Sequence, residues 1–482
     1  MAQPTQTRTA TLPDTPAARR LQMFLDAYNR GDLDSVTEFI TSYYTDPLVE
    51  RGPDSDRAVW NAMDYTNALW HALRTDPSCG LAVHRVERSA PHDIRVLAQC
   101  GLAGEWVYIR VRLAPQEPER MIEFRVRPAL RPPDLATPQP PTADLIGAFA
   151  AFVERLVAAD VFSGAVLVAK DGQPIFERAY GLATQEFEVP NRIDTKFNIG
   201  SLNKMFTAVI IAQLAQEGHL RFGDVISQHL AEYPPQIGGK VTIHHLLAHL
   251  SGIGSYWNER FECERPRIRT VSDFLALFQD DPLNFEPGTR WQYSNGGYII
   301  LGAIIEHVTG MSYYDVVRER IYRAAGMENT DAYEMDMPVR NLAYGYTHVG
   351  PDGWLELAPR RNNLFLHVVK GGPGGGGFST VEDLLRFDRA LREHILLDRA
   401  YTEAVLEGKV AVRGPGLRYG YGFFDRRING QRVVGHSGNF PGIGAQFDMY
   451  LDTGYTVVIL SNYDPCAAQI IVDQMRDLLT RL

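Results

Sequence analysis

Apolar and polar positions along this chain follow a helical period in two segments. From Lys204 to Gln216, apolar side chains recur three and four residues apart. The run from Tyr298 to Val308 has a similar character and ends near Gly310, a residue that commonly terminates helices. Both segments are therefore predicted to be helices, and the short polar strings in front of them lie where these helices begin.

Three later runs have the shorter apolar pattern that is typical of strands. They cover residues 431–436, 444–451 and 455–460. Asp452-Thr453-Gly454 separates the last two runs and predicts a hairpin turn. We therefore expect antiparallel strands here, with His436-Ser437-Gly438 at a strand end.

The first 130 residues show a separate pattern, in which helical segments precede a series of strands. The Pro-rich segment 131–142 follows them, which predicts an independent α+β unit joined by a linker. The predicted helices lie at 16–40, with a break at 29–32, and at 57–73, and the predicted strands lie at 81–87, 94–100, 106–113 and 121–126. The domain boundaries that we expect are 1–15 (disordered), 16–130 (the α+β domain), 131–142 (the linker) and 143–482 (a second, larger domain).

Ser201-Leu202-Asn203-Lys204 places a hydroxyl and an amine about one turn apart at a helix start. A serine hydroxyl needs a nearby base to attack an ester or amide at neutral pH, and Lys204 can reach Ser201. The backbone amides of the first turn favour negative charge, so they would stabilise an oxyanion. The alternative is a serine cap followed by a surface lysine.

Tyr293-Ser294-Asn295 supplies a phenol and an amide two residues apart, which point the same way in an extended segment. A tyrosine near an ammonium gives up its proton more readily, so Tyr293 could act as a base toward Ser201 and as an acid toward the leaving group. Asn295 could contact a substrate carbonyl while steadying Lys204. The alternative is a buried tyrosine beside a turn-forming asparagine.

His436-Ser437-Gly438 is the third candidate string. Gly438 removes a side chain where a ligand must approach the backbone closely. The backbone amide of Asn439 could join that of Ser201 as an oxyanion hole. The alternative is a histidine with a purely structural role at a strand end.

The sequence from Leu145 to Leu482 resembles the serine β-lactamase and penicillin-binding-protein superfamily, in its class C-like branch of esterases, D-amino-acid peptidases and β-lactamases. Besides the three strings, the matching stretches are residues 164–181, 245–253, 376–384 and 419–423. The resemblance implies a mixed α/β (α+β) fold, in which an antiparallel sheet is flanked by helices and accompanied by a helical subdomain.

Carried over residue by residue, the resemblance implies that Ser201 is the acylated nucleophile. It implies that Lys204 and Tyr293 are its proton-transfer partners and that Asn295 contacts a substrate amide. His436 departs from the lysine that many β-lactamases have at this point. A histidine is mostly neutral at pH 7, whereas a lysine offers a permanent cation to a carboxylate, so the departure puts specialisation for β-lactams in doubt.

The expected function is therefore hydrolysis of a small carboxylic ester or a D-residue peptide through a Ser201 acyl-enzyme. The oxyanion and substrate contacts would come from Asn295 and from residues 436–439, and Tyr256 and Trp257 would form part of the pocket wall. β-Lactamase or D-alanyl carboxypeptidase activity is one alternative. A non-catalytic sensor or binding protein that is acylated without turnover is an alternative of another class.

The glycine-rich stretch 371–377 invites a phosphate-loop interpretation, but Phe378 follows it in place of the Lys-Ser or Lys-Thr pair that such a loop needs. We expect a flexible or closely packed loop beside the catalytic cleft instead. No spacing typical of a metal site is present, so neither a metal nor a cofactor is expected.

Composition agrees with an enzyme that acts on small molecules or peptides. The net charge of −10 argues against nucleic-acid binding. The 4 cysteines are scattered, which predicts reduced thiols and no disulfide framework. The polar start of the chain lacks the apolar core of a secretory signal, and no long apolar run predicts a membrane span, so cytoplasmic residence is expected. Periplasmic or secreted residence is the alternative if a signal has been removed by processing.

The segment from Phe24 to Asp32 is similar to the first helix of nuclear-transport-factor-2-like and SnoaL-like cone folds. This resemblance implies a small cone-like α+β domain. Its expected role is to form a homodimer or to shape the mouth of the hydrolase cleft.

Overall fold

The computed structural model of the protein describes residues 10–32, 35–36, 38–39, 80–100, 105–129, 142–350, 359–412 and 416–482. These residues divide into two compact units. The first unit holds the chain up to Phe162 together with residues 348–360 and 469–482, and the second unit holds residues 163–347 and 361–468. Among the described residues, no helix combines the length and the apolar character needed to cross a bilayer.

The described residues of the first unit include an amphipathic helix near its start, a four-stranded antiparallel meander and a helix that follows the meander. Thr15 caps the first of these helices by accepting a hydrogen bond from the Ala18 amide, and Gly31 ends it at φ 71°. The aromatic rings of Phe24, Phe39 and Phe124 pack together with centroids 5.0 to 5.2 Å apart. The elements are α1 (Pro16–Arg30), β1 (Leu81–Ala90), β2 (Asp93–Cys100), β3 (Glu105–Ala114), β4 (Glu117–Ala129) and α4 (Thr142–Ala158).

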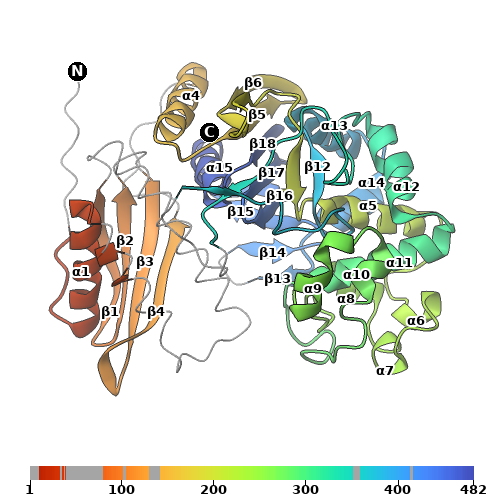
Figure 1. The fold of residues 1–482 in the computed structure, drawn as a ribbon, viewed down its shortest axis with the longest axis horizontal. Coiled ribbons are helices and arrows are strands. Elements are labelled where there is room, and N and C mark those ends of the chain that lie inside the picture. The colour runs from red at the N-terminus through yellow and green to blue at the C-terminus, as the bar shows by residue number, and fades with distance from the viewer. Residues whose placement is uncertain are drawn as a thin grey trace. The chain divides into compact units, whose positions relative to one another are not determined.

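The four strands predicted for this region are confirmed (Figure 1). The helix predicted for 57–73 lies outside the described residues. Residues 10–15, within the segment predicted to be disordered, are described, and the Ala10 amide donates a hydrogen bond to the Val83 carbonyl. The domain boundaries, the cone-like identity and the homodimer stay predictions.

The second unit is built on an eight-stranded antiparallel sheet with the order β13-β14-β15-β16-β17-β18-β5-β6. The hairpin that opens this part of the chain therefore pairs with the last strand (Figure 1). The strands are β5 (Gly164–Lys170), β6 (Gln173–Tyr180), β13 (Val410–Ala411), β14 (Leu417–Tyr419), β15 (Phe424–Ile428), β16 (Gln431–Phe440), β17 (Ile443–Tyr450) and β18 (Tyr455–Ser461). This arrangement confirms the predicted antiparallel sheet flanked by helices.

Smaller strand pairs and helices complete this unit. The paired strands are β7 (Leu182–Thr184) with β8 (Val189–Pro190), β9 (Phe197–Gly200) with β12 (Gly377–Ser379), and β10 (Tyr346–Thr347) with β11 (Arg361–Asn362). The longer helices are α5 (Asn203–Gln216), α11 (Asn295–Thr309), α13 (Val381–Arg392), α14 (Arg399–Leu406) and α15 (Cys466–Leu479), the last of which continues into residues of the first unit.

The short helices α6 to α10 gather at one end of the second unit, together with α11 (Figure 1). They are α6 (Ile226–His229), α7 (Pro235–Gly238), α8 (Ile243–Leu247), α9 (Glu259–Glu264) and α10 (Val271–Leu275), and a 3-10 turn at Arg265–Arg267 follows α9. Elsewhere α12 (Tyr313–Val317) continues into a π-helical turn at Arg318–Arg323. The cluster of α6 to α11 corresponds to the predicted helical subdomain.

Helix α5 lies in the core, whereas α13 has one buried face. Every residue of α5 from Asn203 to Leu214 is buried, which is typical of a helix enclosed on all sides. Helix α13 packs on β5 and β18 and turns charged residues to solvent. The enclosure of α5 matters for function because Lys204 lies in its first turn.

Candidate active site

Ser201 and Lys204 come together at the junction between β9 and α5. β9 ends at Gly200, Ser201 and Leu202 form a turn, and the Lys204 amide donates to the Ser201 carbonyl at 3.1 Å. Lys204 has no exposed surface, and its Nζ lies 3.2 Å from Ser201 Oγ. The predicted proximity of the hydroxyl and the amine is therefore present in the structure.

Two further oxygens hold the Lys204 amine. Its Nζ donates to Asn295 Oδ1 at 2.7 Å and to the carbonyl oxygen of Gly374. Asn295 occupies the first turn of α11, whose start is fixed because Ser294 Oγ accepts a hydrogen bond from the Gly297 amide at 2.9 Å. The three partners thus come from three separate segments of the chain.

The Tyr293 ring lies beside the same amine. Lys204 Nζ is 4.8 Å from the centroid of that ring, within the range of a cation–π contact. The His249 ring packs on the Tyr293 ring at 4.2 Å, and His249 Nδ1 accepts a hydrogen bond from the Ser294 amide at 3.1 Å. His249 therefore positions the backbone that carries the phenol and the amide. Its role was not predicted from the sequence, although it lies in one of the stretches with a family resemblance.

His436 lies inside β16 and not at a strand end, which corrects the prediction. The ladder with β17 continues past it and pairs His436 with Phe447 and Gly438 with Ala445. The polar and glycine residues after His436 lack an apolar alternation, so the sequence pattern ended too early, whereas backbone pairing does not depend on side-chain type.

Both ring nitrogens of His436 have partners within the protein. Nδ1 lies 2.7 Å from the Ser437 carbonyl, so it carries the proton and donates. Nε2 lies 3.1 Å from the Tyr419 hydroxyl. Burial raises the pKa of Tyr419 well above its ordinary value, so this phenol keeps its proton and donates to Nε2. The ring is only 2% exposed.

Two glycines bring β9 and β16 into close contact. A Cβ atom at Gly438 would lie 2.0 Å from the Ile199 carbonyl oxygen, and a Cβ atom at Gly200 would lie 3.1 Å from Gly438 Cα and 3.3 Å from the Asn439 amide nitrogen. Gly200 also has φ 49°, which favours glycine. No side chain fits between the strands here, so the backbone before Ser201 lies directly beside Asn439.

A cavity with about 580 Å³ of empty space, counted to its open mouth, meets this junction. Ser201, Asn295 and Asn439 contribute to its wall, and so do the predicted wall residues Tyr256 and Trp257. Lys204, Tyr293, His436, Ser437 and Gly438 are outside the set of described residues that line it. The glycine-rich stretch predicted to lie beside the cleft contributes Gly371 and Gly374 to Gly376 and is closely packed.

The rest of the wall was not predicted. It includes Met335, residues 367–369 and Phe440. Met335 and residues 367–369 lie on loops without periodic patterning or a recognisable motif, and Phe440 ends β16 beyond the predicted strand, so no signal in a single sequence marks them. Met335 and Val369 are joined because the Met335 amide donates to the Val369 carbonyl at 2.8 Å.

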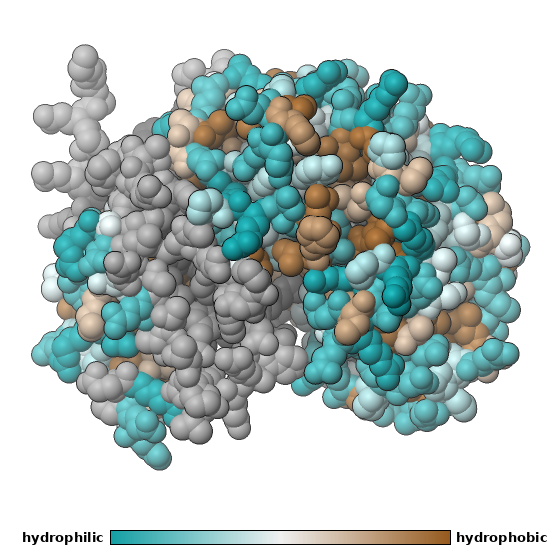
Figure 2. All heavy atoms as spheres, viewed as in Figure 1, coloured by the Kyte–Doolittle hydropathy of each residue, from teal (hydrophilic) through white to brown (hydrophobic). Residues whose placement is uncertain are grey.

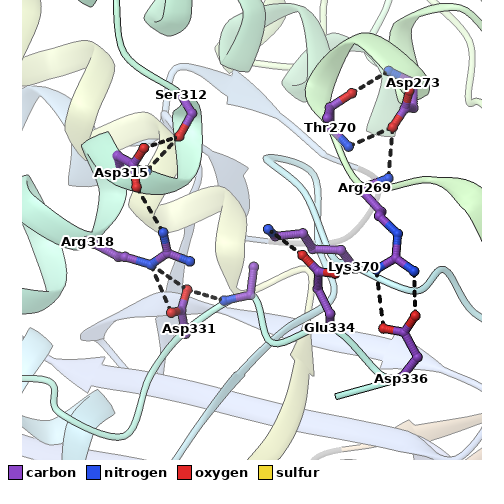
Figure 3. Close-up of polar contacts among 11 residues, drawn as sticks. Arg269, Thr270, Asp273, Ser312, Asp315, Arg318, Asp331, Glu334, Asp336 and Lys370 are labelled. Carbon is purple, nitrogen blue, oxygen red and sulfur yellow. Dashed lines mark hydrogen bonds and ion pairs between the residues drawn. The ribbon is translucent and has the colours of Figure 1, made fainter.

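Ion pairs hold these two loops (Figure 3). Arg269, next to the start of α10, pairs with both Glu334 and Asp336, and Lys370 Nζ donates to Glu334 Oε1 at 3.0 Å. The hydrogen bond from Lys370 lowers the pKa of Glu334, so this carboxylate is charged at neutral pH. We call these four residues the wall clamp, because Glu334, Asp336 and Lys370 are sequence neighbours of Met335 and Val369 and Arg269 pairs with both carboxylates.

The fold and this site define the class of serine hydrolases with a lysine beside the nucleophile. The family described as Beta-lactamase matches residues 149–480, and the chain belongs to this family. The resemblance inferred from the sequence is thereby confirmed.

Three proteins illustrate the similarity. The chain is 32% identical over 315 residues to penicillin-binding protein 4* of Bacillus subtilis, a match that covers 62% of this chain and 68% of the relative. It is 28% identical over 308 residues to the esterase EstB of Burkholderia gladioli, covering 56% and 77%. Among solved structures, a D-stereospecific amidohydrolase from Streptomyces sp. superposes with a TM-score of 0.57 at 25% identity, covering 69% and 98%.

Proposed function

We propose that the protein hydrolyses a neutral carboxylic ester through an acyl-enzyme on Ser201, with D-residue amides as a second class of substrate. The observation that carries this proposal is the position of Lys204 Nζ, 3.2 Å from Ser201 Oγ at the wall of an open cavity. A buried amine in contact with a serine hydroxyl is the arrangement that nucleophilic catalysis requires.

The hydrogen bonds of Lys204 support its role as the proton acceptor. Two of its N–H groups point to Asn295 Oδ1 and to the Gly374 carbonyl. In the neutral amine the remaining position is a lone pair, and Ser201 Oγ lies there to give up its proton as it attacks the acyl carbon. Asn295 thus positions the base and also lines the cavity, where its amide can meet a substrate carbonyl.

Collapse of the tetrahedral intermediate breaks the bond to the leaving group, which takes up a proton. We assign that transfer to the Lys204 and Tyr293 pair, because the phenol ring lies against the amine. Water then attacks the acyl-enzyme, gives its proton to the same pair, and releases the carboxylic acid and Ser201.

The negative charge of the intermediate needs two donors near Ser201. The close contact between Gly200 and the Gly438–Asn439 backbone supports the amides of Ser201 and Asn439 as those donors. Ser437 and Gly438 precede Asn439 and Phe440 on β16, and it is these last two residues that line the cavity where an acyl group would lie. His436 acts behind them, because its two nitrogens already bond Ser437 and Tyr419.

The cavity wall supports an uncharged, largely apolar substrate. Tyr256, Trp257, Phe261 and Phe440 contribute rings, and none of the described lining residues is Lys, Arg, Asp or Glu. Burial also raises the pKa of Tyr256, so it remains neutral. A substrate with an obligatory carboxylate, such as a β-lactam or a D-alanyl-D-alanine peptide, has no cation to meet in this wall, so we rank it below neutral esters and amides.

Exposed apolar side chains on the wall segments agree with this ranking. Trp257 is 51% exposed, Met337 62% and Phe365 84%, and all three lie on segments that form the wall. Figure 2 shows hydrophobic residues among hydrophilic ones on the face of the second unit that it draws. The printed names of the relatives, an esterase and a D-stereospecific amidohydrolase, support the same two substrate classes.

The test combines active-site labelling with turnover. The full chain is treated with a fluorophosphonate and, separately, with p-nitrophenyl butyrate, nitrocefin and a D-alanyl-D-alanine peptide. We expect labelling of Ser201, many turnovers of the butyrate ester, and weak or no hydrolysis of the other two. Ser201→Ala should lose labelling and turnover, whereas Ser272→Ala, at an exposed position on α10, should keep both.

The competing class is a sensor that is acylated but does not release the acyl group. Intact-mass measurements after mixing with the ester separate the two. A stable acyl adduct with a single burst of nitrophenol would mean a sensor, and an adduct that forms and decays while product accumulates supports the hydrolase.

A further inference from the structure

His367 is a cavity residue without a role in the chemistry described above. It lines the cavity that contains Ser201, and it also lines a smaller adjoining space of about 250 Å³. Asn198 and Met335 are shared by the two walls in the same way. His367 therefore lies where an acyl donor larger than a simple ester would extend from the main cavity.

The His367 ring uses one nitrogen in a hydrogen bond within the protein, and its other nitrogen can accept a hydrogen bond from a ligand. Nδ1 lies 3.0 Å from the Val368 carbonyl oxygen, so Nδ1 carries the proton and donates. Nε2 is then the unprotonated nitrogen, and among the described residues it has no hydrogen-bond partner. A nitrogen with a free lone pair in a cavity wall binds an N–H or O–H group and is left unsatisfied by an apolar one.

The neutral form of the ring is favoured by its surroundings. Burial lowers the pKa of His367 below its ordinary value, and the nearby Arg265 guanidinium acts in the same direction. At neutral pH the ring therefore keeps its lone pair. No other imidazole is among the described residues that line the main cavity.

The loop that carries His367 is fixed on both sides. Arg265 Nη1 donates to the Leu366 carbonyl at 3.5 Å, and the Val369 amide donates back to the Arg265 carbonyl at 3.4 Å. Lys370, in the wall clamp, holds the other end through Glu334 (Figure 3). A ring held in this way can discriminate between substrates, because it does not turn aside when a donor is missing.

We propose that His367 Nε2 accepts a hydrogen bond from an N–H group of the substrate, which makes His367 a specificity-determining residue for N-acylated amino acid esters and amides. This inference rests on the proposed function and names the substrate class of the same site. Within the cavity wall, the aromatic rings would bind the apolar part of the acyl donor and His367 its amide N–H. A free ammonium group is disfavoured, because the described lining residues include no carboxylate.

The test uses two p-nitrophenyl esters that differ in one group. N-acetyl-D-alanine p-nitrophenyl ester has the N–H donor, and O-acetyl-D-lactate p-nitrophenyl ester replaces it with oxygen in the same shape. We expect the wild-type chain to prefer the N–H ester by about tenfold in kcat/KM, the usual effect of one hydrogen bond to a buried group. The matched L-esters show whether the preference depends on configuration.

Two variants separate recognition from packing. His367→Leu should abolish the tenfold preference, read as the ratio of kcat/KM between the two matched esters, because leucine offers no acceptor. His367→Gln, which keeps an acceptor, should retain part of the preference. An equal loss on all three esters in both variants would mean that His367 only packs, and it would overturn the inference.

The same measurements distinguish the two levels of the argument. Ser201-dependent turnover of the butyrate ester without a preference between the matched pair overturns the role of His367 alone. Absence of Ser201-dependent turnover with every ester overturns the proposed function, and the role of His367 with it.

Discussion

The two sides of the cavity are held together by different kinds of interaction. On the serine side, Lys204, Asn295 and His436 are buried and joined by neutral or charge-assisted hydrogen bonds to backbone and side-chain oxygens. On the opposing set of loops, the wall clamp is a set of partly exposed ion pairs. Buried hydrogen bonds leave unsatisfied groups when they are broken, whereas exposed ion pairs contribute little and are screened by salt.

This difference predicts that the catalytic residues are held rigidly, whereas the wall that selects the substrate can change without loss of the catalytic residues' positions. A change that breaks the buried hydrogen bonds on the serine side should reduce both activity and stability. A change in the wall clamp should alter the binding of the substrate and leave the chemical step and the fold almost intact. The following experiments test that contrast, from the largest expected effect to the smallest.

Removal of the nucleophile gives the largest effect. Ser201→Ala should lower kcat for p-nitrophenyl butyrate by roughly a thousandfold or more, because no other group can form the acyl-enzyme. The thermal unfolding midpoint should stay near that of the wild type, since the Oγ atom lies at a cavity wall. Kinetics and calorimetry on the same preparation measure both. Substantial remaining turnover would show that the acyl group is carried elsewhere.

Removal of the base tests the buried network. Lys204→Met should lower kcat by roughly a hundredfold to a thousandfold. It should also lower the free energy of unfolding by about 1–3 kcal/mol, because Asn295 Oδ1 and the Gly374 carbonyl lose their donor. Denaturant unfolding and steady-state kinetics provide the readout.

The matched control is Lys196→Met. Lys196 is also a buried lysine, and its Nζ donates to the Arg340 carbonyl at 3.2 Å. This variant should lose stability and keep its kcat. If the two lysine variants lost activity to the same extent, the effect of Lys204 would be one of folding and not of proton transfer.

Removal of the Tyr419 hydroxyl tests whether activity depends on the orientation of the His436 ring. Tyr419→Phe removes the donor to His436 Nε2, so we expect the free energy of unfolding to fall by about 1 kcal/mol and kcat to fall several-fold. Tyr401→Phe is the control, because the Tyr401 hydroxyl donates to the Ala215 carbonyl at 3.2 Å, at the end of α5 opposite to Lys204. A fall in kcat confined to Tyr419→Phe supports orientation, and an equal fall in Tyr419→Phe and Tyr401→Phe argues against it.

A change in the wall clamp should affect substrate binding more than kcat or stability. Arg269→Gln breaks its ion pairs with Glu334 and Asp336, so KM for the N-acetyl ester should rise by a few-fold while kcat and the unfolding midpoint change little. In the wild type, high salt should produce part of the same change by screening. A large loss of kcat in Arg269→Gln would show that the two sides of the cavity are not independent.

Lowering the pH should gradually weaken the hydrogen bond that His367 accepts from the substrate, and this effect should be smaller than those of the variants above. Because the pKa of His367 is lowered in the folded protein, its neutral form persists at neutral pH and is lost as pH falls through that lowered value, below about 6.5. The preference between the two matched esters should therefore decline in acid, with the positive charge of Arg265 opposing protonation. We would also measure the ratio of kcat/KM between the two esters in His367→Leu, which should not depend on pH. If the preference of the wild type were equally constant down to low pH, the acceptor role of His367 would be contradicted.

The sequence alone determined the local elements and the reactive strings. Apolar periodicity predicted α5 over Asn203–Gln216 and α11 over Asn295–Thr309 to within a few residues, because these helices bury most of their length. The order of the strings gave the family. The end of β16 was missed, since Ser437 to Asn439 have no alternating pattern and only the pairing with β17 extends the strand.

Only the tertiary structure decided which side chains share one cavity. The hydrogen bonds from Lys204 Nζ to Asn295 and Gly374 join Lys204 to segments about 90 and 170 residues further along the chain. No local sequence pattern encodes such contacts. His367 and Met335 lie on loops whose conformation is set by ion pairs and backbone hydrogen bonds to distant elements. Helices and strands follow from the preferences of neighbouring residues, whereas a substrate wall made of loops follows from the packing of the whole unit.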